Sequence, residues 1–66
     1  MNPFKKMRKK ANLTQAAVAE KLNITQSAVS QWELGSAMPQ PKMLPKIAKL
    51  YKCRIEDLLK EPEESV

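Results

Sequence analysis

The residues best suited to chemistry in this 66-residue chain are glutamines and serines within residues 26–31. Once the apolar residues of that segment are set aside, Gln26, Ser27, Ser30 and Gln31 remain as neutral hydrogen-bonding side chains. Glutamine can pair bidentately with adenine N6 and N7, and serine can bond several base edges. An ordinary solvated helix face would carry Lys and Glu, so we interpret this face as one that reads DNA bases. The alternative interpretation is that these side chains merely tolerate exposure to water.

Two short helices are needed to position these side chains. Thr14 and Thr25 are suitable N-caps for helices over residues 15–22 and 26–34, and Gly35 is a suitable terminator of the second. The turn between them contains Asn23, and asparagine tolerates the left-handed conformation that a sharp turn needs. The expected apolar anchors, with the small Ala19 at the closest approach, are Val18, Leu22, Ile24, Val29 and Trp32. Such a helix-turn-helix leaves the outer face of its second helix free to enter the major groove.

The first of these two helices begins with Gln15. Backbone N–H groups at a helix N-terminus attract anions, and a glutamine beside them can add a hydrogen bond. We therefore expect Gln15 to bind a DNA phosphate.

Apolar residues at helical spacing predict three further helices. These cover residues 3 to about 10, 44–51 and 55–60. Asn2 followed by Pro3 is typical of an N-cap and first helical residue. Pro45 is tolerated only in the first turn of a helix, which favours a start near Leu44 over one near Pro41. The fold class expected from the sequence is therefore all-α.

One domain is expected over residues 1–60, followed by an acidic flexible tail over residues 61–66. Leu58, Leu59 and Val66 are expected to be exposed and available to a partner or to a second subunit.

The charge of the chain is strongly positive, with a net charge of +5 and a pI near 9.6. Residues 1–10 carry several cations and no acid. Such a field attracts polyanions, of which nucleic acid is the commonest in cells. A basic surface that only keeps the protein soluble would have the same composition, and charge alone leaves both interpretations open.

Other function classes find no support in the sequence. The chain has no histidine, and its one cysteine, Cys53, is interpreted as a small apolar packing residue. We find no residue cluster with metal-ligand spacing and no phosphate-cradling glycine loop, so no enzyme, metal or cofactor is expected. There is also no apolar run of about 20 residues to cross a membrane and none to form a secretory signal, so the cytoplasm is the expected location.

One segment of the chain resembles the helix-turn-helix core of the phage lambda-repressor and Cro-like regulators, also called the Xre family. This segment covers residues 13–35 and reads LTQAAVAEKLNITQSAVSQWELG. The pairing of Thr14-Gln15 with Trp32-Glu33-x-Gly35 is far more specific than a generic helix-turn-helix. The positions that match the fourth and fifth helices of that family are Pro39, Leu44, Ile47-Ala48 and Ile55 to Leu59, so the resemblance covers residues 4–60.

The resemblance implies a compact five-helix domain that binds operator DNA as a symmetric dimer. The phosphate-binding glutamine of the family falls on Gln15. Its base-reading positions fall on Gln26, Ser27 and Gln31, with Ser30 and Thr25 as nearby secondary or backbone contacts.

Further implications concern the surroundings of that helix. Phosphate contacts are implied at Ser36 and at Lys42. An arginine of the first helix pairs with the glutamate that ends the third, here Arg8 with Glu33, and we interpret this ion pair as mainly structural.

The chain departs from the family pattern at two positions. Asn23 replaces the usual turn glycine, which its chemistry allows. Arg54 replaces the usual capping serine, which predicts a weakly held fifth helix and puts a dimer contact through that region in question.

The leading hypothesis is a transcription regulator from a bacterium or a phage, and more narrowly a repressor. It is expected to bind a palindromic double-stranded DNA operator as a homodimer. The C-terminal helix is one candidate for the dimer contact. An antitoxin that also autoregulates is the alternative within DNA binding. A protein-interaction module that keeps the fold without an operator is the alternative from another class, because a fold does not fix a function.

Overall fold

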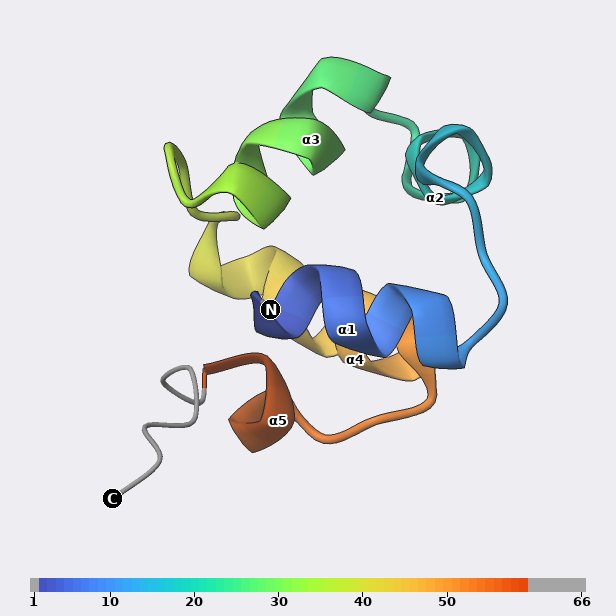
Figure 1. The fold of residues 1–66 in the computed structure, drawn as a ribbon. Coiled ribbons are helices and arrows are strands. Elements are labelled where there is room, and N and C mark those ends of the chain that lie inside the picture. Colours follow the sequence, from blue (N-terminus) through green and yellow to red (C-terminus); the bar gives the residue numbers. More distant parts are fainter. Residues whose placement is uncertain (1, 60–66) are drawn as a thin grey trace.

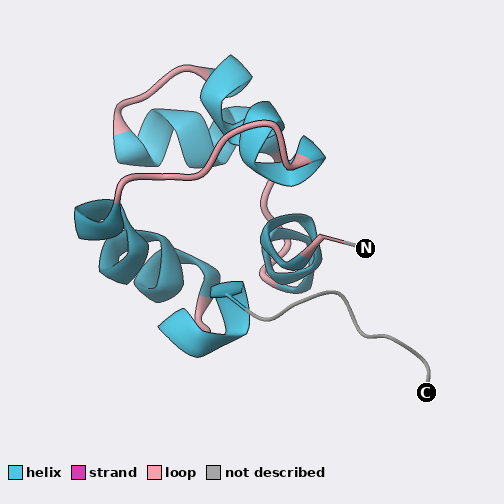
Figure 2. Cartoon of the chain, turned by 90° about the vertical axis from the view of Figure 1, so that its left-hand side faces the viewer, coloured by secondary structure: helices cyan, strands magenta, loops and turns pink. Residues whose placement is uncertain are grey.

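The computed structural model describes residues 2–59 as a chain of short helices (Figure 1). The elements are α1 (Pro3–Lys10), α2 (Gln15–Leu22), α3 (Gln26–Leu34), the short 3-10 turn η1 (Pro41–Met43), α4 (Leu44–Tyr51) and α5 (Ile55–Leu59). Helices and loops make up this whole described part (Figure 2). The all-α fold class with five α-helices is therefore confirmed. The predicted acidic tail over residues 61–66 lies outside the described residues.

Helices α1, α2 and α3 begin where the sequence supplies capping side chains. Asn2 Oδ1 accepts a hydrogen bond of 2.7 Å from the Phe4 backbone N–H at the start of α1. The hydroxyls of Thr14 and Thr25 accept bonds of 3.0 and 3.2 Å from N–H groups in the first turns of α2 and α3. Each cap satisfies a backbone donor that has no partner within its own helix.

Helices α2, α3 and α4 end in left-handed residues. Asn23, with φ 58°, ends α2, and Gly35, with φ 82°, ends α3, as the sequence predicts. Lys52 ends α4 with φ 57°, which lysine tolerates less well than glycine or asparagine. Pro45 lies in the first turn of α4, where its missing N–H removes no helical bond, and this explains the later start of that helix.

The core lies at the centre of the five helices. Every α-helix contributes, through the buried residues Phe4, Val18, Ala19, Val29, Trp32, Ile47, Ala48, Tyr51 and Leu58. The rings of Phe4 and Trp32 meet with centroids 6.1 Å apart, which fixes α1 against α3.

The structure overturns one expectation for α5 and removes the reason given for another. Leu58, predicted to be exposed, is 1% exposed and belongs to the core, because α5 packs on both α1 and α4. The helix is also capped despite the missing serine, because an Asp57 carboxylate oxygen accepts a 3.0 Å bond from the Arg54 backbone N–H. This is the half of a capping box that the third helical residue supplies. Val66 lies outside the described residues.

Two negative findings concern the described residues alone. Within residues 2–59 no helix has the length and hydropathy needed to cross a membrane. The same residues hold no group of three or more acidic or cysteine side chains that could ligate a metal.

Candidate nucleic-acid interface

The α2–turn–α3 unit supplies the frame of the interface. The turn is closed by a 2.9 Å bond from the Ile24 N–H to the Ala19 carbonyl, with left-handed Asn23 between them. Ala19 is buried, and it is small enough to let the two helices pack closely. In Figure 1, α2 is seen end-on beside α3, so the two helices cross steeply. This leaves one face of α3 without a covering element in the described chain.

That face carries the glutamines and serines of the sequence prediction. Gln26, Ser27 and Gln31 are exposed, and Ser30 is partly buried. Gln31 Nε2 donates a 3.3 Å hydrogen bond to Ser27 Oγ one turn away. The bond holds two donor and acceptor groups side by side on an uncharged surface.

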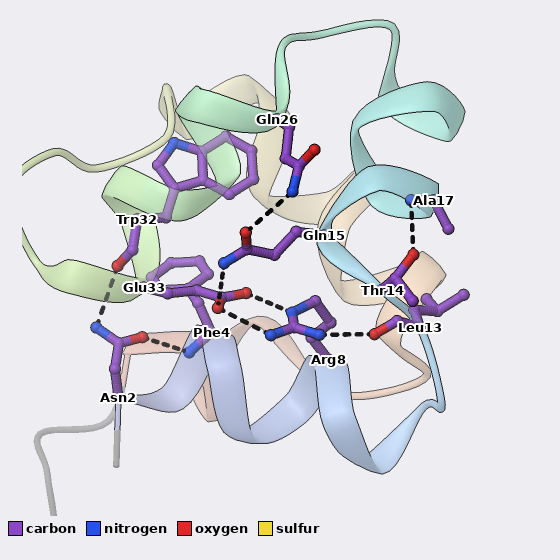
Figure 3. A network of polar contacts seen from close by, with 10 residues as sticks. All are labelled: Asn2, Phe4, Arg8, Leu13, Thr14, Gln15, Ala17, Gln26, Trp32 and Glu33. Carbon is purple, nitrogen blue, oxygen red and sulfur yellow. Dashed lines mark hydrogen bonds and ion pairs between the residues drawn. The ribbon is translucent and has the colours of Figure 1, made fainter.

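Gln15 connects this surface to the interior (Figure 3). Its Nε2 donates a 3.0 Å bond to Glu33 Oε1, and its Oε1 accepts a 3.4 Å bond from Gln26 Nε2. Both glutamines are the first residues of their helices, so the N-termini of α2 and α3 converge here. A bond to the charged Glu33 fixes which end of the Gln15 amide faces Gln26.

The interior end of this network is the ion pair of Arg8 and Glu33, which are 8% and 9% exposed. Arg8 Nε and Nη2 donate to the two carboxylate oxygens of Glu33, at 2.5 and 3.0 Å, and Arg8 Nη1 donates to the Leu13 carbonyl at 2.8 Å. The hydrogen bond to Glu33 raises the pKa of Arg8. Burial alone would raise the pKa of Glu33, but the hydrogen bonds from Arg8 and Gln15 outweigh burial and hold that pKa below its ordinary value. Both groups therefore stay charged at neutral pH.

The other predicted contact residues are placed around α3. Thr25 is exposed and its hydroxyl caps the helix. Ser36 is exposed just beyond the helix, and its hydroxyl donates a 3.5 Å bond to the Gln31 carbonyl. Lys42 is exposed on η1, and no hydrogen bond joins it to the others within the described chain.

A family model described as Helix-turn-helix (HTH_3) matches residues 4–58. The chain belongs to the helix-turn-helix family. The match spans all five helices, so the resemblance to the lambda-repressor and Cro-like regulators is confirmed.

Two curated relatives contain a similar helix-turn-helix domain. The HTH-type transcriptional activator BcrR of Enterococcus faecalis is 36% identical over 60 residues, which is 91% of this chain and 29% of the relative. The uncharacterized HTH-type transcriptional regulator YqaE of Bacillus subtilis is 43% identical over 64 residues, which is 96% of this chain and 55% of the relative. The chain thus spans about a third of one relative and about half of the other. Both names describe regulators rather than enzymes, and no solved structure matches the chain significantly.

Sequence reasoning missed two contacts of α3, one with the residue that caps α1 and one with the first residue of α2. The Asn2 side chain, besides capping α1, donates a 3.1 Å bond to the Trp32 carbonyl in α3. The Gln15 side chain bonds Glu33 of α3 as well as Gln26. The repeated Thr-Gln pair at the starts of α2 and α3 was a signal for the contact of Gln15 with Gln26. The bonds of Gln15 to Glu33 and of Asn2 to Trp32 had no local signal, because these partners are 18 and 30 residues apart along the chain.

Proposed function

We propose that this helix-turn-helix domain binds double-stranded DNA in a sequence-specific manner and serves in transcription regulation. In this proposal α3 enters the major groove, where Gln26, Ser27 and Gln31 contact base edges and Ser30 makes a secondary contact. The observation that carries the proposal is the exposed, uncharged hydrogen-bonding face of α3. The glutamines and serines of this face offer donors and acceptors to bases, and Leu34 at the end of α3 is the exposed apolar residue of the helix.

The contacts that position the domain are proposed to come from the rim of that face. Gln15, Thr25, Ser36 and Lys42 are the proposed phosphate contacts, and all but the partly buried Gln15 are exposed. Such contacts fix the register of a protein on the duplex without reading its sequence. The net charge of +5 favours the approach of the polyanion.

A symmetric homodimer on a palindromic operator is the proposed assembly. Two recognition helices then lie in half-sites about 34 Å apart. The large hydrophobic side chains exposed on the described surface are Leu34 at 78%, Met38 at 62% and Leu59 at 51%. Leu59 is the residue through which the C-terminal helix could contribute to such an interface, since Leu58 is in the core.

The direction of regulation depends on where the operator lies. A dimer bound over a promoter excludes the polymerase, and this is the repressor role proposed from the sequence. One of the relatives is named an activator, so a repressor role is not a property of every relative.

Selection of bound sequences from a random duplex library at physiological salt tests the proposal. We expect an enriched palindromic motif with half-sites about one helical turn apart. The control is a triple variant in which Gln26, Ser27 and Gln31 are replaced by alanine, which should keep weak, salt-sensitive binding and lose the motif. If the unaltered domain enriches no sequence, base recognition is wrong and the fold serves another partner.

A further inference from the structure

A concave surface lies between α1, the turn that joins α4 to α5, and α5 itself. Its volume is about 400 Å³, and its lining includes Lys6, Met7, Lys10, Tyr51, Lys52 and Asp57. We call it the α1/α5 groove. None of its lining residues comes from α2 or α3. In Figure 1, α5 is at the end of the molecule away from α3, so the groove is separate from the proposed DNA-binding face.

The groove gathers positive charge. Lys6 and Lys10 approach it from α1, and Lys52 approaches it from the end of α4. None of the three forms an ion pair within the described residues. Asp57 is the acidic residue in the lining, and one of its carboxylate oxygens accepts the cap bond from the Arg54 N–H. The lining therefore has an excess of positive charge that the described protein does not neutralise.

Lys52 occupies an unusual backbone position in this groove. Its φ of 57° lies in the left-handed region, where α2 and α3 instead end with Asn23 and Gly35. A lysine costs free energy at such a position, and strained residues of this kind cluster at ligand-binding sites. The backbone conformation alone does not explain why a lysine lines the groove at this position.

The wall beside these lysines contains apolar surface and a buried hydroxyl. Met7 and Tyr51 contribute the apolar part. Tyr51 is 2% exposed, and its hydroxyl has no hydrogen-bond partner within the described residues. Burial raises the pKa of Tyr51 to about 12, so the hydroxyl keeps its proton at neutral pH. The groove thus adds apolar surface to its cations, while the Tyr51 hydroxyl is itself closed to solvent.

We propose that the α1/α5 groove binds a small multivalent anion of the phosphate-ester class. The lysines act as point charges on the phosphate groups, a role that the ammonium group fills well. The volume of about 400 Å³ suits a compact ligand rather than a second duplex. Three ammonium groups on two walls match a diphosphate better than a single phosphate. The site does not depend on base recognition by α3.

Titration of the chain with inorganic pyrophosphate at constant ionic strength, followed by backbone amide NMR, tests the proposal. We expect saturable shifts at Lys10, Ala11, Lys52 and Cys53, and smaller shifts throughout α3. Inorganic phosphate should bind the same residues more weakly. Replacing Lys6 and Lys10 by alanine should weaken pyrophosphate binding about fivefold or more, because two exposed ion pairs are lost.

Lys52→Gly is the second variant, and it protects the test against a folding artefact. Glycine relieves the left-handed strain, so the variant should be at least as stable as the parent while binding pyrophosphate more weakly. The matched control replaces Lys46 and Lys49, which carry the same charge on another face of α4 and do not line the groove. Unchanged pyrophosphate affinity in that control supports the site. Two results would overturn the proposal and indicate a diffuse counterion atmosphere instead. One is an equal loss of pyrophosphate affinity in the control variant, and the other is a set of chemical shift changes that rise without saturation at all lysines.

Discussion

The two polar regions of this domain reverse the usual placement of charge. The Arg8–Glu33 pair is charged and buried, whereas the α3 face around Gln26, Ser27 and Gln31 is neutral and exposed. Charges normally stay in water because burial removes their hydration. The buried pair lies where α1 meets α3, so its directional bonds fix the orientation of the helix. The exposed face has no charge to bias it toward phosphates, which suits the base contacts proposed for it.

The largest effect is expected when one member of the buried pair is removed. Arg8→Ala and Glu33→Ala should each lower the free energy of unfolding by about 3–5 kcal/mol, because each leaves a buried charge without its partner. Urea denaturation followed by circular dichroism measures the loss. The double variant Arg8→Met with Glu33→Leu should lose less than either single variant. Single losses below about 1 kcal/mol would mean that the pair behaves as a solvated one.

A change on the neutral face should affect binding and leave stability alone. Gln31→Ala should reduce discrimination at one base pair by about 1–3 kcal/mol. The free energy of unfolding should change by less than about 0.5 kcal/mol, because the side chain is exposed. Competition binding with single-base variants of the selected operator measures the discrimination. Gln40→Ala, an exposed glutamine outside α3, is the control and should change neither quantity. Equal weakening on every sequence would show that Gln31 reads no base.

Gln15→Ala should affect both regions, each by a smaller amount. The lost bond to Glu33 should lower the free energy of unfolding by about 1 kcal/mol. The Gln26 amide also loses its hydrogen-bond partner, so discrimination at the base pair that Gln26 contacts should fall. Because Gln15 is a proposed phosphate contact, the affinity should also fall equally on all sequences. Denaturation and competition binding follow the two effects. Gln26→Ala is the control, because it should change discrimination without the loss of stability. If Gln15→Ala matched that control in both measurements, the bond to Glu33 would carry no stability.

Lowering the pH should reduce the stability that the buried ion pair contributes. It should not change the charge of the α3 face, which has no titratable side chain. The pKa of Glu33 is lowered from its ordinary value of 4.5 in the folded state, so its stabilising contribution is present above about pH 4.5. The contribution is lost as the pH falls through the lower, folded-state pKa. Denaturation curves over an acidic pH series measure this slope. The Arg8→Met, Glu33→Leu variant should have a shallower slope, and an unchanged slope would assign the acid sensitivity to other carboxylates.

The smallest effect is expected at a single exposed cation of α1. Lys9→Ala should weaken DNA binding on all sequences alike and reduce the magnitude of the salt slope by at most about 1. Affinities at several salt concentrations, on the operator and on an unrelated duplex, measure the change. A shift in base preference would contradict a purely electrostatic role for Lys9.

Local signals in the sequence predicted the helices well. The caps Asn2, Thr14 and Thr25, together with the left-handed ends Asn23 and Gly35, act over a few residues, and the structure has all five where they were expected. The bounds of α2 and α3 agree with the prediction for the same reason.

Contacts between distant parts of the chain were harder to predict. Leu58 was misassigned because the five residues of α5 are too few to show which side faces the core. The Asp57 cap was overlooked because position 54 was judged by its own side chain. The link from Gln15 to Glu33 depends on how α2 and α3 pack, which no spacing in the sequence encodes. The roles of the α3 side chains toward bases remain predictions.

The single tryptophan of the chain gives this domain a built-in optical reporter. Trp32 packs on Phe4, its carbonyl accepts the Asn2 side chain, and its neighbour in sequence is Glu33. Its indole fluorescence therefore reports the α1–α3 junction without an added dye. Because Trp32 is buried in the core, a red shift of that emission would signal that water had reached the α1–α3 junction. A substitution that loosens the junction should therefore change the emission, whereas a substitution confined to the exposed α3 face should leave it unchanged.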